Sequence, residues 1–245
     1  MTITKQKIIK YLKKLILMMA LILVGTSLGA YLRIRHDDLH QISKEMSLLE
    51  CHKKNGLRAN CIDKNGNSIL SIMAARIKNP KVLILYLIEG LNINHQNFYD
   101  YTPLMLAIKY NKNPNIIKFL LDHGADVNKK NIYGDTALIM AIKYNRTLKE
   151  IKLILKQGAD VNAKNKVGYT PLKYAMKYEN YKIMDLLVKY GADVAMRTDH
   201  GVTVLHWGSL LVKPKIIVRL IEKYNADVNV VDDYGYTPLM YAMAR

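Results

Sequence analysis

Cysteine, proline and glycine are all scarce in this sequence of 245 residues. Its two cysteines exclude a scaffold built on disulfides and cannot supply a four-thiolate metal site. Its 6 prolines and 13 glycines exclude collagen-like chains and low-complexity segments rich in these residues. Half of the residues are hydrophobic, which is enough for a packed core. The sequence therefore predicts a globular chain of one or two domains.

Acidic residues are few relative to basic ones. The 37 Lys and Arg residues outnumber the 20 Asp and Glu residues, which gives a formal net charge of +17. A basic chain suggests nucleic-acid binding, because Lys and Arg neutralise phosphates. Lysine outnumbers arginine 29 to 8, however, and arginine is the residue that makes bidentate contacts with phosphates and base edges. Nucleic-acid binding is therefore the least favoured function.

One long uncharged stretch, residues 15–32, follows the basic segment 1–14. As a helix it is about 27 Å long, close to the thickness of about 30 Å of a bilayer's hydrocarbon core. Lysines dominate the preceding segment, so we expect a single-pass membrane anchor with a cytoplasmic N-terminus. The alternative is a cleaved signal peptide that leaves a secreted or periplasmic protein. The most apolar part of the stretch 15–32 spans only residues 15–24, as in a signal peptide. Ser27 and Gly29 suit the −3 and −1 positions of a cleavage site.

The remainder of the sequence repeats itself. Segments such as YTPLMLA, DTALIMA and YTPLKYA recur, and successive Ser or Thr residues in them lie 34, 34, 34, 33 and 34 residues apart. These residues are Ser68, Thr102, Thr136, Thr170, Thr203 and Thr237. A second block of the type Gly-Ala-Asp-Val-Asn recurs in the same register. Periods of 20–50 residues indicate stacked structural repeats.

Thr-Pro-Leu and Gly-Ala-Asp-Val-Asn at this spacing resemble the signature of the ankyrin repeat family. The resemblance covers residues 63–245. It implies an all-α solenoid of helix-turn-helix repeats joined by β-turn loops. In this sequence the transmembrane or signal helix precedes the solenoid. The repeat boundaries are 63–97, 98–131, 132–165, 166–198, 199–232 and a partial unit 233–245. Residues 36–62 are interpreted as a degenerate half-repeat that caps the stack.

Individual residues indicate the same repeat. Thr102 is placed to cap a helix that begins at Pro103, and Gly124 is placed to end the second helix of that repeat. One repeat cannot bury both of its helices, so neighbouring repeats must stack. Small residues recur in the first helices, where we expect close backbone approach: Ala107, Ala141, Ala175 and Gly208.

Two departures from the repeat are visible. The first three repeats carry an extra residue between their helices, which lengthens a loop. The fifth repeat carries its extra residue after the second helix, with Asn225 in place of Gly, so we expect a somewhat weaker unit there. The partial last repeat ends at Arg245, and we expect it to fray, to be covered by a partner or to result from a shortened reading frame.

No catalytic motif is found, so we expect neither enzymatic activity nor a cofactor. His36 and His40 have the spacing of a metal pair but lack a third ligand nearby. Cys51 and Cys61 form a disulfide only if the domain is exported, and as small hydrophobes they need none. The recurrent aspartates are predicted to brace turns: Asp126, Asp160, Asp193 and Asp227. His123 and His206 resemble the loop-bracing histidines of ankyrin repeats.

The resemblance also implies a binding surface. In ankyrin repeats the last two residues of the first helix and the tips of the preceding loop line the concave side and vary with the partner. Here these residues are Tyr99, Tyr101, Lys109, Tyr110, Tyr133, Lys143, Tyr144, Tyr169, Lys177 and Tyr178. Tyrosine provides a large, rigid contact area with a polar tip, although it also suits half-exposed positions in a biased genome.

We therefore predict a membrane-tethered, non-catalytic module that binds a protein through this surface. The lysines favour a partner with acidic groups around an apolar centre. The alternatives are an exported effector, or a fragment of a larger protein whose activity lies in a missing C-terminal part. Nothing in the sequence favours a small-molecule ligand.

Overall fold

The computed structural model describes residues 62–88, 91–211 and 213–244. The basic segment 1–14, the apolar residues 15–32 and all but the last residue of the half-repeat 36–62 lie outside the described residues. The metal pair and the disulfide considered above lie outside them too. Within the described ranges, no helix is both long enough and apolar enough to cross a bilayer.

The chain divides into two compact units between Asp126 and Val127. The helices of unit 1 are α4 (Ile69–Arg76), the short 3-10 helix η2 (Pro80–Val82), α5 (Leu83–Ile88), α6 (Pro103–Tyr110) and α7 (Pro114–Asp122). Within this unit α4 packs against α6, and α7 packs against α6 as the second helix of the same repeat. Leu104, Ile108, Ile116 and Leu120 are fully or almost fully buried, so the apolar stripes of α6 and α7 form the core of the unit.

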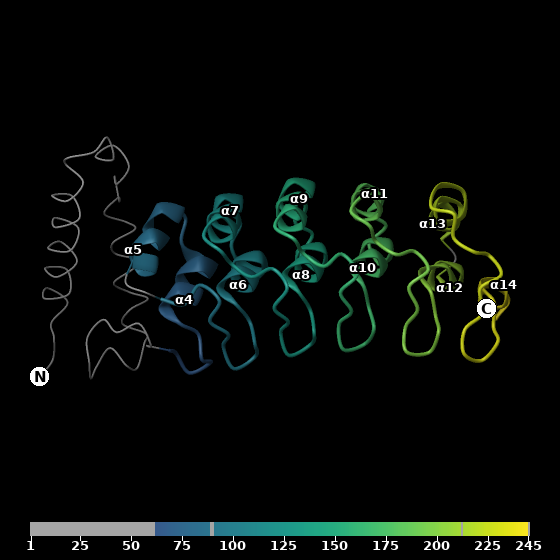
Figure 1. The fold of residues 1–245 in the computed structure, drawn as a ribbon, viewed down its shortest axis with the longest axis horizontal. Helices are drawn as coiled ribbons and strands as arrows, with labels where there is room; N and C mark the ends of the chain where they lie inside the picture. The colour runs from purple at the N-terminus through teal and green to yellow at the C-terminus, as the bar shows by residue number, and fades with distance from the viewer. Residues whose placement is uncertain (1–61, 89–90, 212, 245) are drawn as a thin grey trace, which may run out of the picture. The chain divides into compact units, whose positions relative to one another are not determined.

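Unit 2 contains three complete repeats and the first helix of a fourth. Its helices are α8 (Ala137–Lys143), α9 (Leu148–Lys156), α10 (Pro171–Lys177), α11 (Tyr181–Lys189), α12 (Val204–Leu210), α13 (Pro214–Val218), the π-helical turn η3 (Arg219–Lys223) and α14 (Pro238–Met243). Figure 1 shows α8, α10, α12 and α14 in one layer, and α9, α11 and α13 in a second layer. We call these the first-helix layer and the second-helix layer of unit 2. The loops between repeats project from the first-helix layer (Figure 1).

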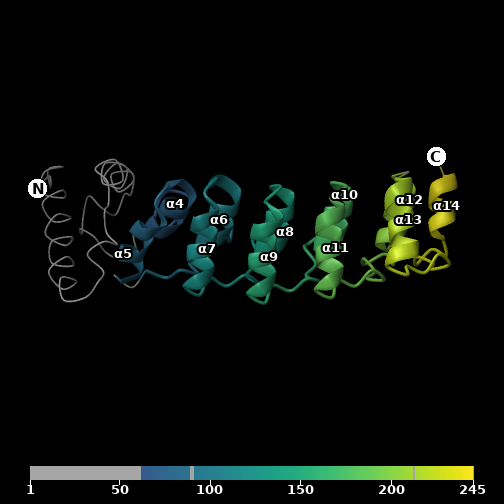
Figure 2. The same cartoon turned by 90° about the horizontal axis from the view of Figure 1, so that it is seen from above.

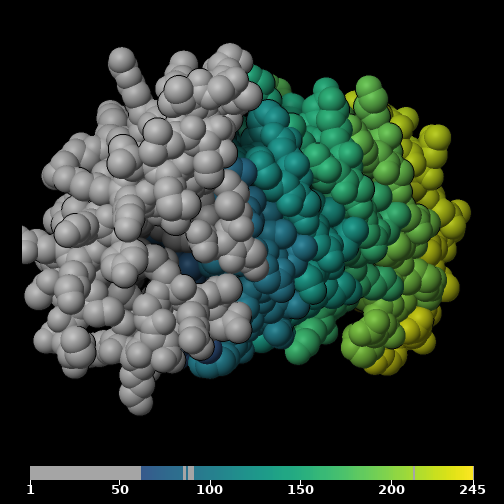
Figure 3. Space-filling model, turned by 60° about the vertical axis from the view of Figure 1, so that its left-hand side comes forward, coloured from purple at the N-terminus to yellow at the C-terminus, as the bar shows by residue number. Residues whose placement is uncertain are grey.

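The repeats of unit 2 follow one another in space in the order of the chain. In Figure 2 the pairs α8 with α9, α10 with α11, and α12 with α13 follow one another. The space-filling view shows the same order within this unit as adjoining bands from green to yellow (Figure 3). Each interior repeat of the unit therefore buries its helices against its neighbours, as stacked repeats require.

Threonine side chains cap the first helices α6, α8, α10 and α14, and the cap predicted for Thr102 is confirmed. The Oγ1 atom of Thr102 accepts a hydrogen bond from Met105 N at 3.2 Å, and that of Thr170 accepts one from Lys173 N at 3.3 Å. Thr136 and Thr237 make the same contact. These bonds satisfy amides that would otherwise lack partners at the helix start, and each cap is worth about 1 kcal/mol.

The second helices end in the left-handed conformation, as predicted. The φ angles are +87° at Gly124, +81° at Gly158, +89° at Gly191 and +54° at Asn225. Glycine adopts this conformation without strain, and Asn is the next most suitable residue. The sequence therefore positions the ends of these four second helices through a single residue each.

The extra residue of the fifth repeat does not follow the second helix, so that prediction is wrong; it forms a π-helical turn within the helix. The amide of Ala192 bonds to the carbonyl five residues earlier, Leu187, at 2.9 Å, whereas the amide of Ala226 bonds to the carbonyl six residues earlier, Leu220, also at 2.9 Å. The π turn η3 thus absorbs the insertion inside the helix. The loop that follows keeps the same register as in the other repeats.

Asparagines and aspartates of the repeated second block fix the loops. In unit 2, Asn128 donates to the carbonyl of Gly158 at 3.0 Å and accepts from the amide of Asp160 at 2.8 Å, so it joins one loop to the next. The Oδ1 atoms of Asp160, Asp193 and Asp227 each accept from the amide two residues later, at 2.8–2.9 Å. The turn-bracing role predicted for these aspartates is confirmed.

The two histidines predicted to brace loops differ. His206 makes a 3.0 Å hydrogen bond from Nε2 to the carbonyl of Tyr236 in the next loop, so this prediction is confirmed. His123 instead pairs its Nδ1 with the carbonyl of Phe119 in its own helix, and its ring stacks on that of Phe119 at 4.0 Å. The prediction for His123 is wrong, because the ring lies at an exposed helix end and satisfies the nearest carbonyl.

Candidate functional site

Three tyrosines that follow a lysine at the end of a first helix are exposed. Tyr110 is the last residue of α6 in unit 1, and Tyr144 and Tyr178 directly follow α8 and α10 in unit 2. They are 57%, 40% and 48% exposed, respectively. Rings with this much exposure contribute only part of their area to the fold, so they can contact another molecule.

In unit 1, one lysine lies close to the rings of two tyrosines of the predicted binding surface. The Nζ atom of Lys109 lies 5.2 Å from the ring centroid of Tyr101 and 5.0 Å from that of Tyr110. Tyr101 is half-buried, whereas Tyr99 at the preceding loop tip is exposed. Cation–π attraction of this kind orders both rings.

In unit 2, four aromatic side chains form a continuous cluster. The ring of Tyr169 lies 5.8 Å from that of Tyr174 and 5.9 Å from that of Trp207, in edge-to-face geometry. The ring of Tyr174 stacks on that of Tyr178 at 6.4 Å. Each pair contributes about 0.5–1.5 kcal/mol beyond its buried area, so the rings hold one another in place. Tyr133, on the loop before α8, is 56% exposed.

Lys143 and Lys177 occupy the same place in α8 and α10 but have different surroundings. The Nζ atom of Lys143 donates to the buried carboxylate of Asp135 at 2.6 Å and lies 5.3 Å from the ring centroid of Tyr174. Burial lowers the pKa of Lys143, but the hydrogen bond and charge of Asp135 outweigh it, and the pKa lies above its ordinary value. Lys177 is exposed. Lys143 therefore stabilises the fold, whereas Lys177 presents its charge to solvent.

The structure adds a residue that the sequence analysis missed, Lys173, the third residue of α10. It is 6% exposed, and its Nζ atom lies 3.1 Å from the ring centroid of Tyr169 and 3.4 Å from that of Trp207. Burial, followed by the charge of Lys177, lowers the pKa of Lys173 to about 7. The sequence did contain a signal, because Lys173 stands 33 residues before His206, at the same place in its repeat.

The candidate site is accordingly a surface of unit 2. We call Tyr133, Tyr144, Tyr169, Lys177 and Tyr178 its first-helix surface. These residues come from the first-helix layer and from the loops that precede α8 and α10. Tyr169 and Tyr178 belong to the aromatic cluster, and Tyr169 also contacts Lys173, so part of this surface is held rigidly.

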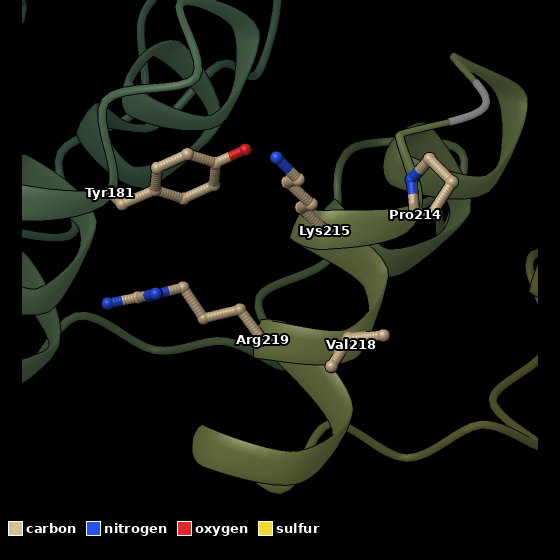
Figure 4. Close-up of a pocket in the computed structure, with 5 residues that line it drawn as sticks. All are labelled: Tyr181, Pro214, Lys215, Val218 and Arg219. Carbon is tan, nitrogen blue, oxygen red and sulfur yellow. The ribbon is translucent and has the colours of Figure 1, made fainter.

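A pocket of about 370 Å³ lies in the second-helix layer, between α11 and α13. It is lined by Tyr181, Pro214, Lys215, Val218 and Arg219 (Figure 4). Figure 4 shows the hydroxyl of Tyr181 and the amino group of Lys215 pointing toward each other. The guanidinium carbon of Arg219 lies 5.4 Å from the ring centroid of Tyr181.

The arginine of this pocket is engaged in an ion pair. Its Nε atom donates to Asp185 Oδ1 at 3.1 Å, and Lys223 and Tyr224 also donate to this carboxylate. The hydrogen bond from Arg219 holds the pKa of Asp185 well below its usual range. Burial and then the hydrogen bond to Asp185 raise the pKa of Tyr224 to about 12. Because these groups join α11 to η3, the pocket is a weaker candidate than the first-helix surface.

In the part of the chain that the structure describes, no group of three or more His, Cys, Asp or Glu side chains is placed to hold a metal ion.

Comparison with known proteins agrees with this architecture. Residues 87–141 match a family model described as ankyrin repeats (many copies), and residues 129–198 match one described as ankyrin repeats (3 copies). No curated protein matches the sequence significantly. The solved ankyrin repeat domain of Bcl-3, described as a unique member of the IkappaB protein family, is 24% identical. The match covers 83% of this chain and 90% of that one, with a TM-score of 0.70, and shows a shared fold.

Proposed function

Because this chain is a member of the ankyrin repeat family, matched over residues 87–198, we propose that it is a non-catalytic module that binds a partner protein. The contact is made by the first-helix surface of unit 2. One observation carries this proposal: Tyr144 and Tyr178 stand at the same place in successive repeats and are both exposed. Large exposed aromatic side chains at repeated positions supply the contact area that protein interfaces favour.

The rigidity of this surface supports the proposal. Tyr178 stacks on Tyr174, so little conformational freedom is lost when the ring is buried by a partner. Tyrosine carries few rotatable bonds and a polar tip, which are the properties that make it frequent in binding surfaces. Lys177 beside it favours a partner whose surface is acidic.

We also propose that residues 15–32 tether the module to a membrane, with the N-terminus in the cytoplasm. The support is the sequence itself, an uncharged run of helix-spanning length that follows a lysine-rich segment. Cleavage as a signal peptide is the alternative, and it would release a secreted or periplasmic protein.

Affinity capture with variants tests the binding proposal. We expect the double variant Tyr144→Ala/Tyr178→Ala to lose the proteins captured by the wild-type chain, because each truncation removes an aromatic anchor worth about 2 kcal/mol or more at the centre of an interface. A partner identified by mass spectrometry is then purified, and its affinity is measured by calorimetry.

A matched control removes two tyrosines from the second-helix layer of the same unit. Tyr181→Ala/Tyr190→Ala deletes the same atoms from the two ends of α11, away from the first-helix layer. We expect it to bind like the wild type. Equal binding by the Tyr144→Ala/Tyr178→Ala variant, with an unchanged circular dichroism spectrum, would show that the partner uses another surface.

A further inference from the structure

Lys173 corresponds in position to His206 of the next repeat, and both ring nitrogens of His206 have hydrogen-bond partners. His206, the third residue of α12, pairs Nδ1 with the Thr203 hydroxyl at 3.0 Å and Nε2 with the Tyr236 carbonyl at 3.0 Å. In α8 the corresponding residue is Ile139, which is fully buried and apolar. Lys173 is buried like both of them, but its ammonium group has no hydrogen-bond acceptor among the described residues.

A second donor beside it is also unsatisfied. The Nε1 atom of Trp207 is buried without a hydrogen-bond acceptor in the described part of the chain, and the Nζ atom of Lys173 lies 3.4 Å from the centroid of the Trp207 ring. A buried donor without an acceptor costs about 1–3 kcal/mol, and more when it is charged. The aromatic faces of Tyr169 and Trp207 attract the cation, but they do not provide a hydrogen bond. Two buried donors in contact through the Trp207 ring therefore lack an acceptor among the described residues.

We propose that Lys173 and the indole N–H of Trp207 form a binding site for a carboxylate group, supplied by an acidic segment of the partner protein. This inference rests on the proposed function, because the site lies beside Tyr169 of the first-helix surface. A carboxylate has two oxygen atoms, one for each donor, and a charge-assisted hydrogen bond to an ammonium group is among the stronger ones in proteins. The lysine and the tryptophan thus select for acidic side chains.

No nearby carboxylate among the described residues pairs with Lys173, so the carboxylate has to come from the partner. On α10 itself Lys177 repels the cation, and the helices packed against α10 contribute further charged or titratable groups: Lys143 from α8, Tyr181, Lys182, Asp185 and Lys189 from α11, and His206 from α12. Lys143 is paired with Asp135, and Asp185 is paired with Arg219. Neither carboxylate hydrogen-bonds to Lys173.

Binding at this site takes up a proton. Because the pKa of Lys173 is lowered to about 7, the amine is about half charged near neutral pH in the unbound protein. A carboxylate pairs only with the charged form, so the bound lysine is fully protonated. The affinity is therefore highest below pH 7 and falls about tenfold between pH 6 and pH 8.

The test is isothermal titration calorimetry of the full-length protein with hexaglutamate that is acetylated and amidated at its ends. Repetition at pH 7 in two buffers of different ionisation enthalpy measures proton uptake, and we expect about half a proton per site. Lys173→Met should weaken binding about tenfold or more and abolish this uptake. Lys166→Met removes the same charge from an exposed position on the preceding loop, and it should change affinity less than about threefold and keep the uptake.

Unchanged affinity in Lys173→Met, no proton uptake by the wild type, or no binding of hexaglutamate by the wild type would each overturn the proposal. If Lys173→Met does not fold, Trp207→Phe keeps an aromatic ring but removes the N–H donor, and we expect it to weaken binding at least threefold. Hexaglutamate has no apolar side chains, so Tyr144→Ala/Tyr178→Ala should bind it within about twofold of the wild type. Loss of hexaglutamate binding therefore tests the carboxylate site alone, whereas loss of captured proteins in the tyrosine variant tests the first-helix surface.

Discussion

Replacement of Lys173 by methionine is expected to make the fold more stable at neutral pH. In the folded protein the amine is buried between Tyr169 and Trp207 without a hydrogen-bond acceptor in the described residues, whereas in the unfolded chain it is hydrated. Burial, followed by the charge of Lys177, lowers the pKa from 10.5 to about 7. At about 1.36 kcal/mol per pKa unit, this difference destabilises the fold at pH 7 by about 4 kcal/mol.

The net gain is smaller than this figure. The rings of Tyr169 and Trp207 attract the charged form of Lys173, which offsets about 1–2 kcal/mol of the cost. Methionine is unbranched like lysine, and its thioether makes favourable contacts with aromatic rings. We therefore expect Lys173→Met to raise the free energy of unfolding at pH 7 by about 2 kcal/mol.

The effect depends on pH with a defined sign. Above pH 7 the folded protein loses the proton of Lys173, while the unfolded chain keeps it until the pH approaches 10.5. The unfolded state binds more protons in this window, so the stability of the wild type rises with pH. The advantage of the variant should therefore shrink by about 1 kcal/mol between pH 7 and pH 8.

Urea denaturation at these two pH values measures the effect. Unfolding is followed by circular dichroism and by the fluorescence of Trp207, the single tryptophan of the chain. Lys166→Met is the control and should stay within about 0.5 kcal/mol of the wild type, because Lys166 is exposed. A variant less stable than the wild type, or a difference that does not change from pH 7 to pH 8, would show that Lys173 is not a destabilising buried amine.

Three further predictions follow from the fold and the sequence. Ala141 is fully buried in α8, so Ala141→Leu should overpack the helix contact, cost about 1–3 kcal/mol and lower the melting temperature; an unchanged melting curve would contradict the helix register. The ion pair with Arg219 lowers the pKa of Asp185, so the stabilisation from this pair is present above the unfolded pKa of 3.8 and is lost as the pH falls. Asp185→Asn should therefore lower the free energy of unfolding by about 1 kcal/mol at pH 7 and by less at pH 3, as measured by urea denaturation. If residues 15–32 form an anchor, the full-length protein should resist carbonate extraction with an intact N-terminus, and a mature N-terminus near Ala30 in a soluble fraction would exclude the anchor.

The repeat architecture could be predicted from the sequence because its determinants are local. Thr102 and Thr170 cap helices through amides three residues away, and Gly124 ends a helix through its own backbone angle. Each of these features depends on a few neighbouring residues. The repeat spacing then fixes which helices are first and which are second.

Features that depend on competing geometries could not be predicted. The extra residue of the fifth repeat could lengthen the loop or widen the helix, and only the hydrogen bond from Ala226 to Leu220 shows that it widens the helix. His123 could brace a loop or bond to its own helix, and the nearby carbonyl of Phe119 is the partner that it meets. The residue types allow both outcomes in each case.

In the candidate site too, some features could be predicted from the sequence and others could not. The exposed positions of Tyr144 and Tyr178 follow from their place in the repeat, which the resemblance to the family supplies. The surroundings of Lys173 do not, because they require Tyr169 and Trp207, from two successive repeats, to converge on one side chain. Such a contact depends on the packing of neighbouring repeats, which periodicity alone does not specify.

Hydrogen–deuterium exchange of the full-length protein, free and bound to its captured partner, shows which helix layer the partner covers. We expect partner binding to slow exchange at the ends of α8 and α10 and in the loops that carry Tyr133 and Tyr169, while α9, α11 and α13 stay unchanged. Protection confined to α9, α11 and α13, with the first-helix surface unaffected, would contradict this expectation.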